Sequence, residues 1–356
     1  MLSEEKYSAS TEELLLAHAR AYPRLCASDV FKFAYQSAFG CEHLVSDDSH
    51  ALENIKEEYE RAGKDKAPLT EELDGEYCRV HLSYLGVGLS PETLARLFVL
   101  SAKMEPGGGA RERLCEILAV ARRLVRDGAL PIPLRQFDEA LSVWQTEGLP
   151  PRHSETFRET YSPAYRVIAK KYARFLPLFA KVDALLEKSP VTLVIEGGAA
   201  SGKTTLAAIL REVYGCAVFH TDDFFLQPHQ RTAQRLCEVG GNLDRERFFD
   251  EVVRPLRERK PIIYRAFDCA TQSLAAPVTV TPTPLTVVEG VYSMHPAFSR
   301  YFDLSVFLEV DPVSQKERII ERNSERLAER FFSEWIPLEN AYFDEMKIKA
   351  SCDIIL

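Results

Sequence analysis

The sequence predicts an α/β domain, with a parallel sheet flanked by helices, preceded by a separate, mostly α-helical domain. Two observations predict this organisation. From residue 190 onward, short apolar runs rich in β-branched residues alternate with helix-like segments, which is the pattern of a parallel sheet. Over residues 1–189, apolar residues recur at helical spacing between helix start and stop signals. A chain of 356 residues is also longer than one ordinary domain.

The composition narrows the functional classes. The net charge is −9 and we find no long basic run, which argues against a nucleic-acid partner. The acidic, polar start MLSEEKYSAS does not resemble a signal peptide, and no apolar run approaches the roughly 20 residues of a membrane span. Eight cysteines form no C-x-x-C pair, so reduced thiols are favoured over disulfides or a zinc site. We therefore expect a cytoplasmic protein without a membrane partner, while a homo-oligomer stays open.

Helix signals recur throughout residues 1–189. Ser10 and the pair Ser90-Pro91 are typical helix starts, and Gly40 is a typical stop. Residues 154–188 are helical in pattern but interrupted by Pro163 and Pro177. The predicted helices cover residues 11–22, 29–39, 49–62, 91–104 and 110–127.

Two polar groups in this half could do more than stabilise the fold. One is Glu42-His43 and the other is Glu76, Arg79 and His81. Carboxylate plus imidazole suits a metal site or an acid–base pair, but the spacing fits no ligand pattern. We favour capping and core hydrogen bonds for both groups. The domain's role stays open between sensing a ligand, docking a partner and covering an active site.

The strongest motif follows an apolar strand at residues 191–195. It reads GGAASGKTT and matches the phosphate-binding loop G-x-x-x-x-G-K-[ST] between a strand and a helix. Its glycines allow positive φ and close approach to an anion, while successive amides and the helix N-terminus direct positive charge at phosphates. We expect Lys203 to reach the β and γ phosphates of ATP and Thr204 to ligate Mg²⁺. The predicted nucleotide-binding residues are Gly197, Gly198, Ala199, Ala200, Ser201, Gly202, Lys203, Thr204 and Thr205.

Acidic residues end two further predicted strands. Asp222-Asp223 follow the strand 216–220, and Glu289 follows the strand 285–288. In a parallel α/β sheet, ligands bind beyond the carboxyl ends of the strands. Glu289 therefore suits a metal site, and one of the two aspartates suits proton abstraction from a hydroxyl or a metal-bound water. Capping of the next helix is the alternative for the aspartates.

The remaining elements complete the predicted domain. A helix over 244–259 is expected to bend at Pro255, and a long helix is expected after Asp311. On that long helix Arg318, Arg322, Arg326 and Arg330 recur every four residues and would share one face. We expect Arg318 and Arg322 to belong to a mobile lid that neutralises phosphoryl charge, and the other two to be solvated. Further strands are predicted at 261–265, 278–280, 304–310 and 354–356.

With these motifs in order, the second half resembles the uridine kinase-like branch of P-loop kinases. That branch includes uridine–cytidine kinases, phosphoribulokinase, bacterial pantothenate kinase and nicotinamide riboside kinase. The resemblance covers residues 190–356 and none of the first half. The motifs that carry it are GGAASGKTT, HTDDFF followed by Pro228, GNLDRERF, YRAFDCATQ, VTVTPTPLTVVEG and the arginine-bearing helix.

The resemblance implies roles for particular residues. Asp222 would be the catalytic base, Asp244 would hold sugar hydroxyls, and Glu289 would support the metal. The segment that begins at Tyr264-Arg265 would bind the substrate, with Phe267, Asp268 and Gln272 in the loop that meets its base or acyl end. Uridine kinases tend to place a histidine where this chain has Gln272, and the tail WIPLENAYFDEM falls outside the family pattern. The resemblance thus supports a kinase more strongly than it supports uridine as substrate.

Together these features predict a kinase that uses ATP and Mg²⁺ to phosphorylate a primary hydroxyl of a small molecule, with a nucleoside favoured. One alternative is a kinase for another hydroxyl metabolite, pantothenate-like or nicotinamide riboside-like. The other is a nucleotide-binding regulatory module.

Overall fold

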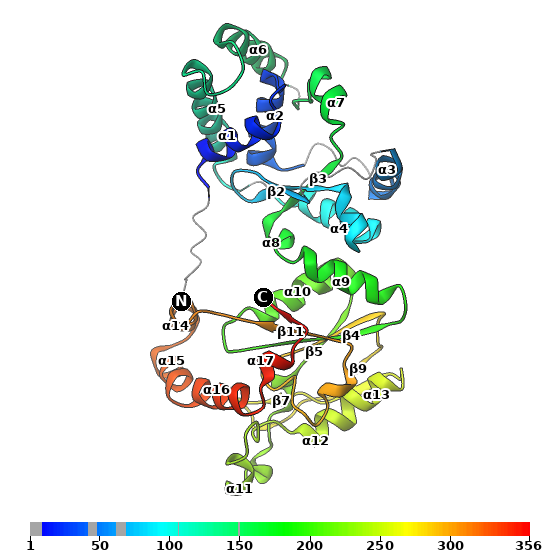
Figure 1. The fold of residues 1–356 in the computed structure, drawn as a ribbon. Helices are drawn as coiled ribbons and strands as arrows, with labels where there is room; N and C mark the ends of the chain where they lie inside the picture. Colours follow the sequence, from blue (N-terminus) through cyan, green and yellow to red (C-terminus); the bar gives the residue numbers. More distant parts are fainter. Residues whose placement is uncertain (1–8, 42–47, 62–68, 106, 149) are drawn as a thin grey trace. The chain divides into compact units, whose positions relative to one another are not determined.

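The chain folds into two compact units. The computed structural model describes residues 9–41, 48–61, 69–105, 107–148 and 150–356 (Figure 1). The units are Met1–Ala184 and Leu185–Leu356, and the division falls within helix α9 (Leu176–Leu186), slightly before the proline-marked boundary suggested by the sequence. None of the described helices is both long and apolar enough to cross a bilayer.

The N-terminal unit is mostly helical, as predicted. Ser10 caps α1 in a capping box with Glu13, Ser90 caps α4, and Gly40 ends α2 with a φ of 64°. These three signals therefore act where the sequence places them. The helices described in this unit are α1 (Thr11–Ala21), α2 (Ala27–Phe39), α3 (Asp48–Arg61), η2 (Leu82–Val87), α4 (Pro91–Ala102), α5 (Ala110–Arg126), α6 (Leu134–Glu147), α7 (Glu155–Tyr161), α8 (Lys170–Ala173) and α9.

The described part of this unit also contains a small antiparallel sheet that the sequence reasoning missed. Its strands β1 (Thr70–Glu72), β2 (Tyr77–His81) and β3 (Tyr165–Ala169) pair in the order β1-β2-β3. The helical pattern expected over 154–188 is therefore wrong at β3. Every residue of β2 is buried, so this strand lacks the apolar–polar alternation that marks a half-exposed strand.

The C-terminal unit, all of which is described, is built on a parallel sheet, which confirms the predicted α/β class. Its strands are β4 (Val191–Gly197), β5 (Ala217–His220), β10 (Leu285–Glu289), β11 (Leu304–Leu308) and β12 (Ile354–Ile355), in the order β12-β11-β4-β10-β5. All pairs are parallel, so the carboxyl ends of all strands lie at one edge. That edge carries the predicted chemistry.

Both faces of this sheet are covered, which is why its strands are apolar on both sides. Helix α10 (Lys203–Tyr214) packs on one face, against β4, β5 and β10. The opposite face belongs to a core that includes Val194, Phe219 and Val288 from the strands, together with Phe248 and Tyr342. Side chains alternate between the two faces along a strand. Because Val288 points away from α10, Val287 and Glu289 point toward it.

Shorter elements surround the sheet. The predicted strand at 261–265 and the predicted arm at 278–280 pair with each other as β6 (Ile262–Tyr264) and β9 (Val278–Val280). Helix α12 (Arg245–Phe248) continues through a π-helical segment η5 (Phe249–Val253) into α13 (Arg254–Arg257), so the chain is irregular next to Pro255, which lacks an amide donor. The others are η3 (Thr221–Phe224), η4 (Pro228–Gln230), α11 (Ala233–Leu236), β7 (Phe267–Asp268), β8 (Ser273–Leu274), η6 (Ser299–Tyr301) and α17 (Ile348–Ser351).

The long arginine-bearing helix is interrupted, which corrects one prediction. Asp311 caps α14 (Pro312–Arg322) as expected, but Asn323 is extended and the chain restarts as α15 (Glu325–Arg330). Arg326 and Arg330 therefore do not share a helix face with Arg318 and Arg322. Asn323-Ser324 supplies the break, because Asn323 donates its side-chain amide to the Ile319 carbonyl. The π-helical η7 (Phe331–Trp335) and α16 (Ile336–Glu345) follow.

Candidate active site

The phosphate loop lies between β4 and α10, at the carboxyl edge of the sheet. Gly197 has a φ of 144°, and a Cβ at this position would lie 2.5 Å from the Leu308 carbonyl oxygen. Gly202 has a φ of 100° and forms the N-cap of α10. Glycine is therefore required at Gly197 both by backbone conformation and by close packing.

The interior of the loop is organised by Lys203. Its Nζ donates hydrogen bonds of 2.8 Å to the carbonyl oxygens of Gly197 and Gly198. The Ser201 hydroxyl is buried and has no hydrogen-bond partner within the described residues. An ammonium bonded to backbone carbonyls, a buried hydroxyl without a partner and a helix N-terminus together suit an anion such as a phosphate chain.

Glu289 is positioned by strand register. It lies beside Ile195 of β4 on one side and His220 of β5 on the other, and it points to the α10 face. There the Thr204 hydroxyl donates to Glu289 Oε1 at 3.1 Å, and His220 Nδ1 lies 2.6 Å from the same oxygen. This hydrogen bond raises the pKa of His220. The sequence reasoning placed His220 in a strand but gave it no role.

Thr204 and Glu289 form an oxygen-donor pair of the kind that Mg²⁺ prefers. The described residues contain no group of three or more His, Cys, Asp or Glu side chains able to hold a metal alone. The pair therefore fits a cation that takes its remaining ligands from phosphate oxygens and water, as Mg²⁺ usually does.

Asp222 belongs to the same cluster. It is exposed to solvent at the edge, yet it is crowded by protein atoms, and the loss of hydration raises the pKa of its carboxyl group. Its charge interacts with those of Lys203, which lowers the pKa, and Glu289, which raises it. Because His220 pairs with Glu289 in the neighbouring strand, the carboxylates at 222 and 289 lie at the same edge of the sheet as the phosphate loop. Unlike that of its neighbour, the Asp222 carboxylate accepts no hydrogen bond from the described residues.

Both the carboxylate and the carbonyl oxygen of the adjacent Asp223 are engaged in hydrogen bonds within the protein. Its carboxylate accepts a hydrogen bond from the Tyr264 hydroxyl, and its carbonyl oxygen accepts one from Arg247 at 3.0 Å. Burial raises the pKa of Asp223 as well. Of the two aspartates, Asp222 is the one whose carboxylate stays available to an incoming group, and Tyr264 acts here by holding Asp223.

The predicted sugar-binding Asp244 is engaged within the protein. It is 2% exposed and caps α12 by accepting from the Arg247 amide at 3.2 Å. Its other oxygen accepts from Gln230 Nε2 at 2.9 Å. In this state Asp244 fixes the segment next to Asp223.

The predicted substrate loop forms a β7–β8 hairpin, and β7 packs beside η3, which carries Asp222. Arg265 donates to the carbonyls of Leu274 and Ala275 and closes the base of the hairpin. Phe267 is buried, with the Arg231 guanidinium 5.5 Å from its ring centre. The structure therefore brings this loop to the edge of the sheet that carries Asp222.

Within the hairpin, two predicted contacts serve the turn itself. Asp268 Oδ1 accepts from the Ala270 amide at 2.7 Å, and Gln272, with a φ of 56°, donates to the Cys269 carbonyl at 2.6 Å. Both side chains are on the exposed part of the loop, at the side where the Cys269 thiol interacts electrostatically with Asp222.

Helix α14 contacts the phosphate loop through two side chains. Arg318 donates to the Ala200 carbonyl at 3.0 Å, and Gln315 donates to the Ala199 carbonyl at 2.9 Å. Arg322, in the last turn of α14, is exposed and makes no hydrogen bond to the phosphate loop. Of the two predicted lid arginines, Arg318 contacts the phosphate loop in this structure and Arg322 does not.

Two acidic residues at the loop escaped the sequence reasoning. Glu339 of α16 is 7% exposed, and its Oε2 accepts from the Ala199 amide at 2.8 Å. Glu196 is fully buried and accepts from the Gly197 amide, the Met294 amide and the Tyr342 hydroxyl, each at 3.0 Å. Burial raises the pKa of Glu339 and brings that of Glu196 to about 7.

Of these two residues, only Glu196 has a local sequence pattern that could have identified it as a site residue. Glu196 is an acid at the tip of an apolar strand, the same pattern that identified Glu289. Glu339 comes from a helix 140 residues away in the chain, and nothing in its local sequence indicates contact with the loop.

A separate cavity of about 530 Å³ lies at the opposite edge of the sheet, near Val191, Thr286 and Asp303. These residues are at or next to the starts of β4, β10 and β11, so the cavity is remote from the phosphate loop.

Comparisons with known proteins are distant. No family model and no curated protein sequence matches the chain. Among solved structures, a Bacillus stearothermophilus protein proposed to be a uridine kinase is 20% identical, with a TM-score of 0.39, over 51% of this chain and 99% of its own. A Silicibacter protein proposed to be a fructose transport system kinase is 22% identical, with a TM-score of 0.39, over 50% of this chain and 97% of its own. Shikimate kinase from Acinetobacter baumannii is 16% identical, with a TM-score of 0.27, over 48% of this chain and 85% of its own.

The fold of the C-terminal unit is clear from its own geometry. A parallel sheet, a glycine-rich loop after β4 and a helix that begins at Lys203 are the parts of a phosphate-loop α/β domain. Residues 185–356 therefore form a P-loop α/β unit, joined to a mostly helical N-terminal unit.

Proposed function

We propose that this protein is a kinase that uses ATP and Mg²⁺ to phosphorylate a primary hydroxyl of a small molecule, with a nucleoside as the favoured acceptor. The observation that supports it is the position of Asp222. Asp222 follows His220, which pairs with Glu289 in the neighbouring strand, so both carboxylates lie at one edge of the sheet. The charge of Asp222 interacts with those of Lys203 and Glu289, and its carboxylate has no hydrogen-bond partner among the described residues. Such an arrangement can receive a hydroxyl group next to a bound phosphate chain.

The phosphate loop would bind the nucleotide. Its amides and the N-terminus of α10 supply positive potential, and Lys203 would exchange its bonds with the Gly197 and Gly198 carbonyls for phosphate oxygens. Thr204 and Glu289 would hold Mg²⁺, which neutralises charge on the phosphate oxygens when bound.

Asp222 would accept the proton of the acceptor hydroxyl as its oxygen bonds to the γ-phosphorus. The bond from that phosphorus to the bridging oxygen breaks, and ADP leaves with the electron pair. Arg318 and Arg322 would supply positive charge from the α14 side. Phosphoryl transfer has a loose transition state, so positioning and electrostatics should contribute more than base catalysis.

The substrate would lie against the β7–β8 hairpin and the segment around Asp223. Tyr264, Arg265, Phe267, Asp268 and Gln272 would shape this side of the site, with Asp244 behind it. Because uridine kinases tend to have histidine where this chain has Gln272, the acceptor can be a compound other than uridine. We propose a small-molecule partner in the cytoplasm, with no nucleic-acid or membrane partner.

A ligand screen tests the acceptor. The intact protein would be melted with a non-hydrolysable ATP analogue and Mg²⁺, with and without nucleosides, pantothenate, nicotinamide riboside and other hydroxyl metabolites. A ligand that binds only the folded state stabilises it by mass action and therefore raises the melting temperature. At a ligand concentration of 100 times the Kd, the gain in the free energy of unfolding is about 2.7 kcal/mol. Hits are then incubated with ATP, and the phosphorylated product is identified by mass spectrometry.

The same screen separates the rival functions. A product from a non-nucleoside identifies a different acceptor within the kinase class. If the ATP analogue stabilises the protein but no hydroxyl compound is phosphorylated, the regulatory-module alternative replaces the kinase.

A further inference from the structure

A cavity of about 900 Å³ lies in the described part of the N-terminal unit and takes no part in the proposed kinase chemistry. One wall is the start of α2, and the facing wall is one side of α6, with Trp144 near its end. The segment Pro150–Arg152 closes the cavity between them. Its lining residues are Ser28, Phe31, Lys32, Gln136, Glu139, Ala140, Val143, Trp144, Glu147, Pro150, Pro151 and Arg152.

Lys32 gives this cavity a distinct charge. Its side chain is partly buried, and its Nζ donates a long hydrogen bond of 3.5 Å to the Pro151 carbonyl. No ion pair within the described residues includes it, although Asp29 lies near enough on the same helix to interact through space. Burial, Arg79 and Arg152 all lower the pKa of Lys32, to about 8. A partly desolvated ammonium beside a second cation is stabilised by an anion placed between them.

The rest of the lining is largely apolar and includes an aromatic surface. Trp144 is partly exposed and stacks on the buried Phe31, with ring centres 5.2 Å apart and planes 11° from parallel. Val143, the residue before Trp144 on α6, is 57% exposed. An occupant with a flat, apolar body could cover this surface while its charged end reaches the cations.

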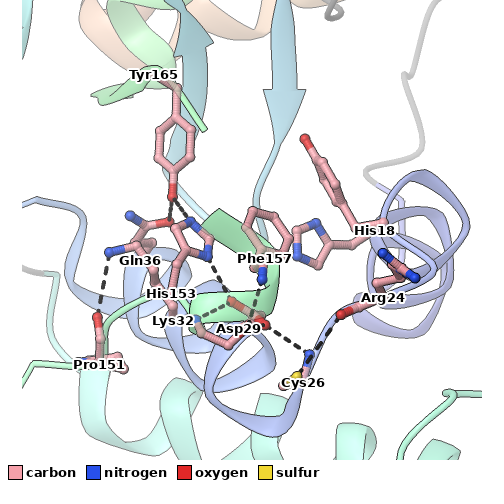
Figure 2. Close-up of polar contacts among 12 residues, drawn as sticks. His18, Arg24, Cys26, Asp29, Lys32, Gln36, Pro151, His153, Phe157 and Tyr165 are labelled. Carbon is pink, nitrogen blue, oxygen red and sulfur yellow. Dashed lines mark hydrogen bonds and ion pairs between the residues drawn. The ribbon is translucent and has the colours of Figure 1, made fainter. Parts of the chain in front are cut away.

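A buried network fixes α2, which carries Lys32, to the segment that follows Arg152 (Figure 2). Asp29, one turn before Lys32 on α2, is fully buried and accepts from the Ser154 amide at 2.9 Å and its hydroxyl at 2.7 Å. His153 lies 2.9 Å from Asp29 through Nδ1 and 2.6 Å from the Tyr165 hydroxyl through Nε2. The segment next to Arg152 is thus tied to α2 before any ligand arrives, which lowers the entropic cost of binding.

The network also accounts for part of the predicted Glu76, Arg79 and His81 group. Arg79 is fully buried and donates to Gln36 at 2.9 Å and to Glu71 at 3.1 Å, while Glu76 is exposed and outside the cluster. Since Glu71 neutralises Arg79, Lys32 and Arg152 are the cations left to face the cavity. The other predicted group, Glu42-His43, lies outside the described residues.

We propose that this cavity is a binding site for a small anion with a flat apolar body, such as an aromatic carboxylate or phosphomonoester. The anionic group would bind Lys32 Nζ and Arg152, and the body would lie against Trp144, which stacks on the buried Phe31. Glu139 and Glu147 of α6 also line the cavity and disfavour a second negative group on the ligand, and Glu139 is paired with Arg135. This assigns the N-terminal unit a ligand-sensing role independent of the kinase proposal.

The chain offers a direct reporter for this site. Trp144 and Trp335 are its two tryptophans, so the Trp335→Phe protein reports on Trp144 alone. Phenyl phosphate and phenylacetate would be titrated into this full-length protein without nucleotide, with benzyl alcohol as the uncharged analogue. We expect saturable quenching by at least one of the two anions and none by benzyl alcohol at the same concentrations. The anion that binds more tightly identifies the preferred head group.

Variants locate the binding. Lys32→Met should weaken the anion at least tenfold, whereas Lys181→Met, a change of the same charge at an exposed lysine of α9, should alter it less than twofold. Lys203→Met should leave the quenching intact, because the phosphate loop is not involved. Lys32→Met should also raise the melting temperature of the ligand-free protein, since it removes an unpaired cation. If Lys32→Met does not fold, Arg152→Met, at an exposed side chain, should weaken the anion several-fold.

Three results would overturn the proposal. The first is equal saturation by benzyl alcohol, which would indicate a purely apolar surface. The second is an affinity unchanged by Lys32→Met or Arg152→Met in a folded protein. The third is no saturable quenching by either anion.

Discussion

Glu339 and Ala199 are joined by a hydrogen bond of 2.8 Å, in which the amide of the phosphate loop donates to a buried carboxylate from α16. The chain thus places its own anion on a loop whose amides are suited to phosphate. The charges of Lys203 and Asp222 act on the same carboxylate, so Glu339 lies within the electrostatic field of the site. Two unit charges 6 Å apart interact by about 3 kcal/mol at an effective dielectric constant of 20.

Glu339→Gln should therefore tighten ATP binding. The amide oxygen of glutamine can still accept the Ala199 hydrogen bond, while the repulsion between the carboxylate and the incoming phosphates is removed. We expect the Kd for ATP to fall roughly tenfold, or about 1.4 kcal/mol, measured by titration calorimetry. Glu345→Gln, at an exposed position on the same helix, is the matched control and should change little. Weaker binding in Glu339→Gln would instead make Glu339 a brace that the nucleotide needs.

Asp222→Asn should lower turnover by roughly 10²- to 10⁴-fold, the usual contribution of a positioned base. ATP affinity should stay within a few-fold, because the proposed contact of Asp222 is with the acceptor hydroxyl rather than with the phosphates. Asp223→Asn is the matched control, since that carboxylate is held by Tyr264 and should affect the acceptor KM more than kcat. Wild-type turnover in Asp222→Asn would remove the base assignment.

Thr204→Val should raise the Mg²⁺ concentration needed for half-maximal turnover by at least roughly tenfold, since it deletes one of the two proposed protein oxygens. Thr204→Ser should restore the wild-type requirement. Thr205→Val, one position further along α10, serves as the control for helix stability. A Mg²⁺ requirement shared by all three variants and the wild type would show that Thr204 is not a ligand.

Glu196 should make the C-terminal unit less stable as pH rises from about 4.5 to 7. Burial brings the pKa of Glu196 to about 7 in the folded protein, above its ordinary value of 4.5. The folded state therefore binds the proton more tightly, and this stabilisation is complete at low pH and lost as pH passes the folded pKa. The effect is at most about 3 kcal/mol.

Glu196→Gln should remove this pH dependence. In a Trp144→Phe background, urea unfolding followed by Trp335 fluorescence reports on the C-terminal unit. The free energy of unfolding of the variant, relative to that of the unsubstituted protein, should increase as pH rises from 5 to 8. A constant difference across that range would mean that Glu196 keeps an ordinary pKa in the folded state.

Local signals in the sequence were enough to place the phosphate loop and the acids at the strand tips. The run from Val191 to Thr205 contains the strand, the glycines and the helix start together. Asp222 and Glu289 could be placed because parallel strands end at a common edge, so strand order was not needed.

Contacts between distant segments could not be predicted in this way. The bond between Glu339 and Ala199 depends on how α16 returns to the sheet, and the Asp29–His153 pair joins segments 124 residues apart. β3 was missed because five residues are too few to show a period. The break after Arg322 was missed because the four-residue repeat of arginines continues through Asn323, although the backbone does not.

The position of β10 between β4 and β5 has a consequence for how this protein can vary. Its start is fixed on both sides, since the Pro284 carbonyl accepts from the Val191 amide at 2.8 Å and the Thr283 hydroxyl accepts from the Ala217 amide at 2.8 Å. Inserting a single residue between Pro284 and Glu289 would turn the Glu289 carboxylate toward the opposite face of the sheet, away from Thr204. Length changes should therefore be tolerated in the hairpins that surround the sheet, whereas the five residues from Leu285 to Glu289 must keep their number.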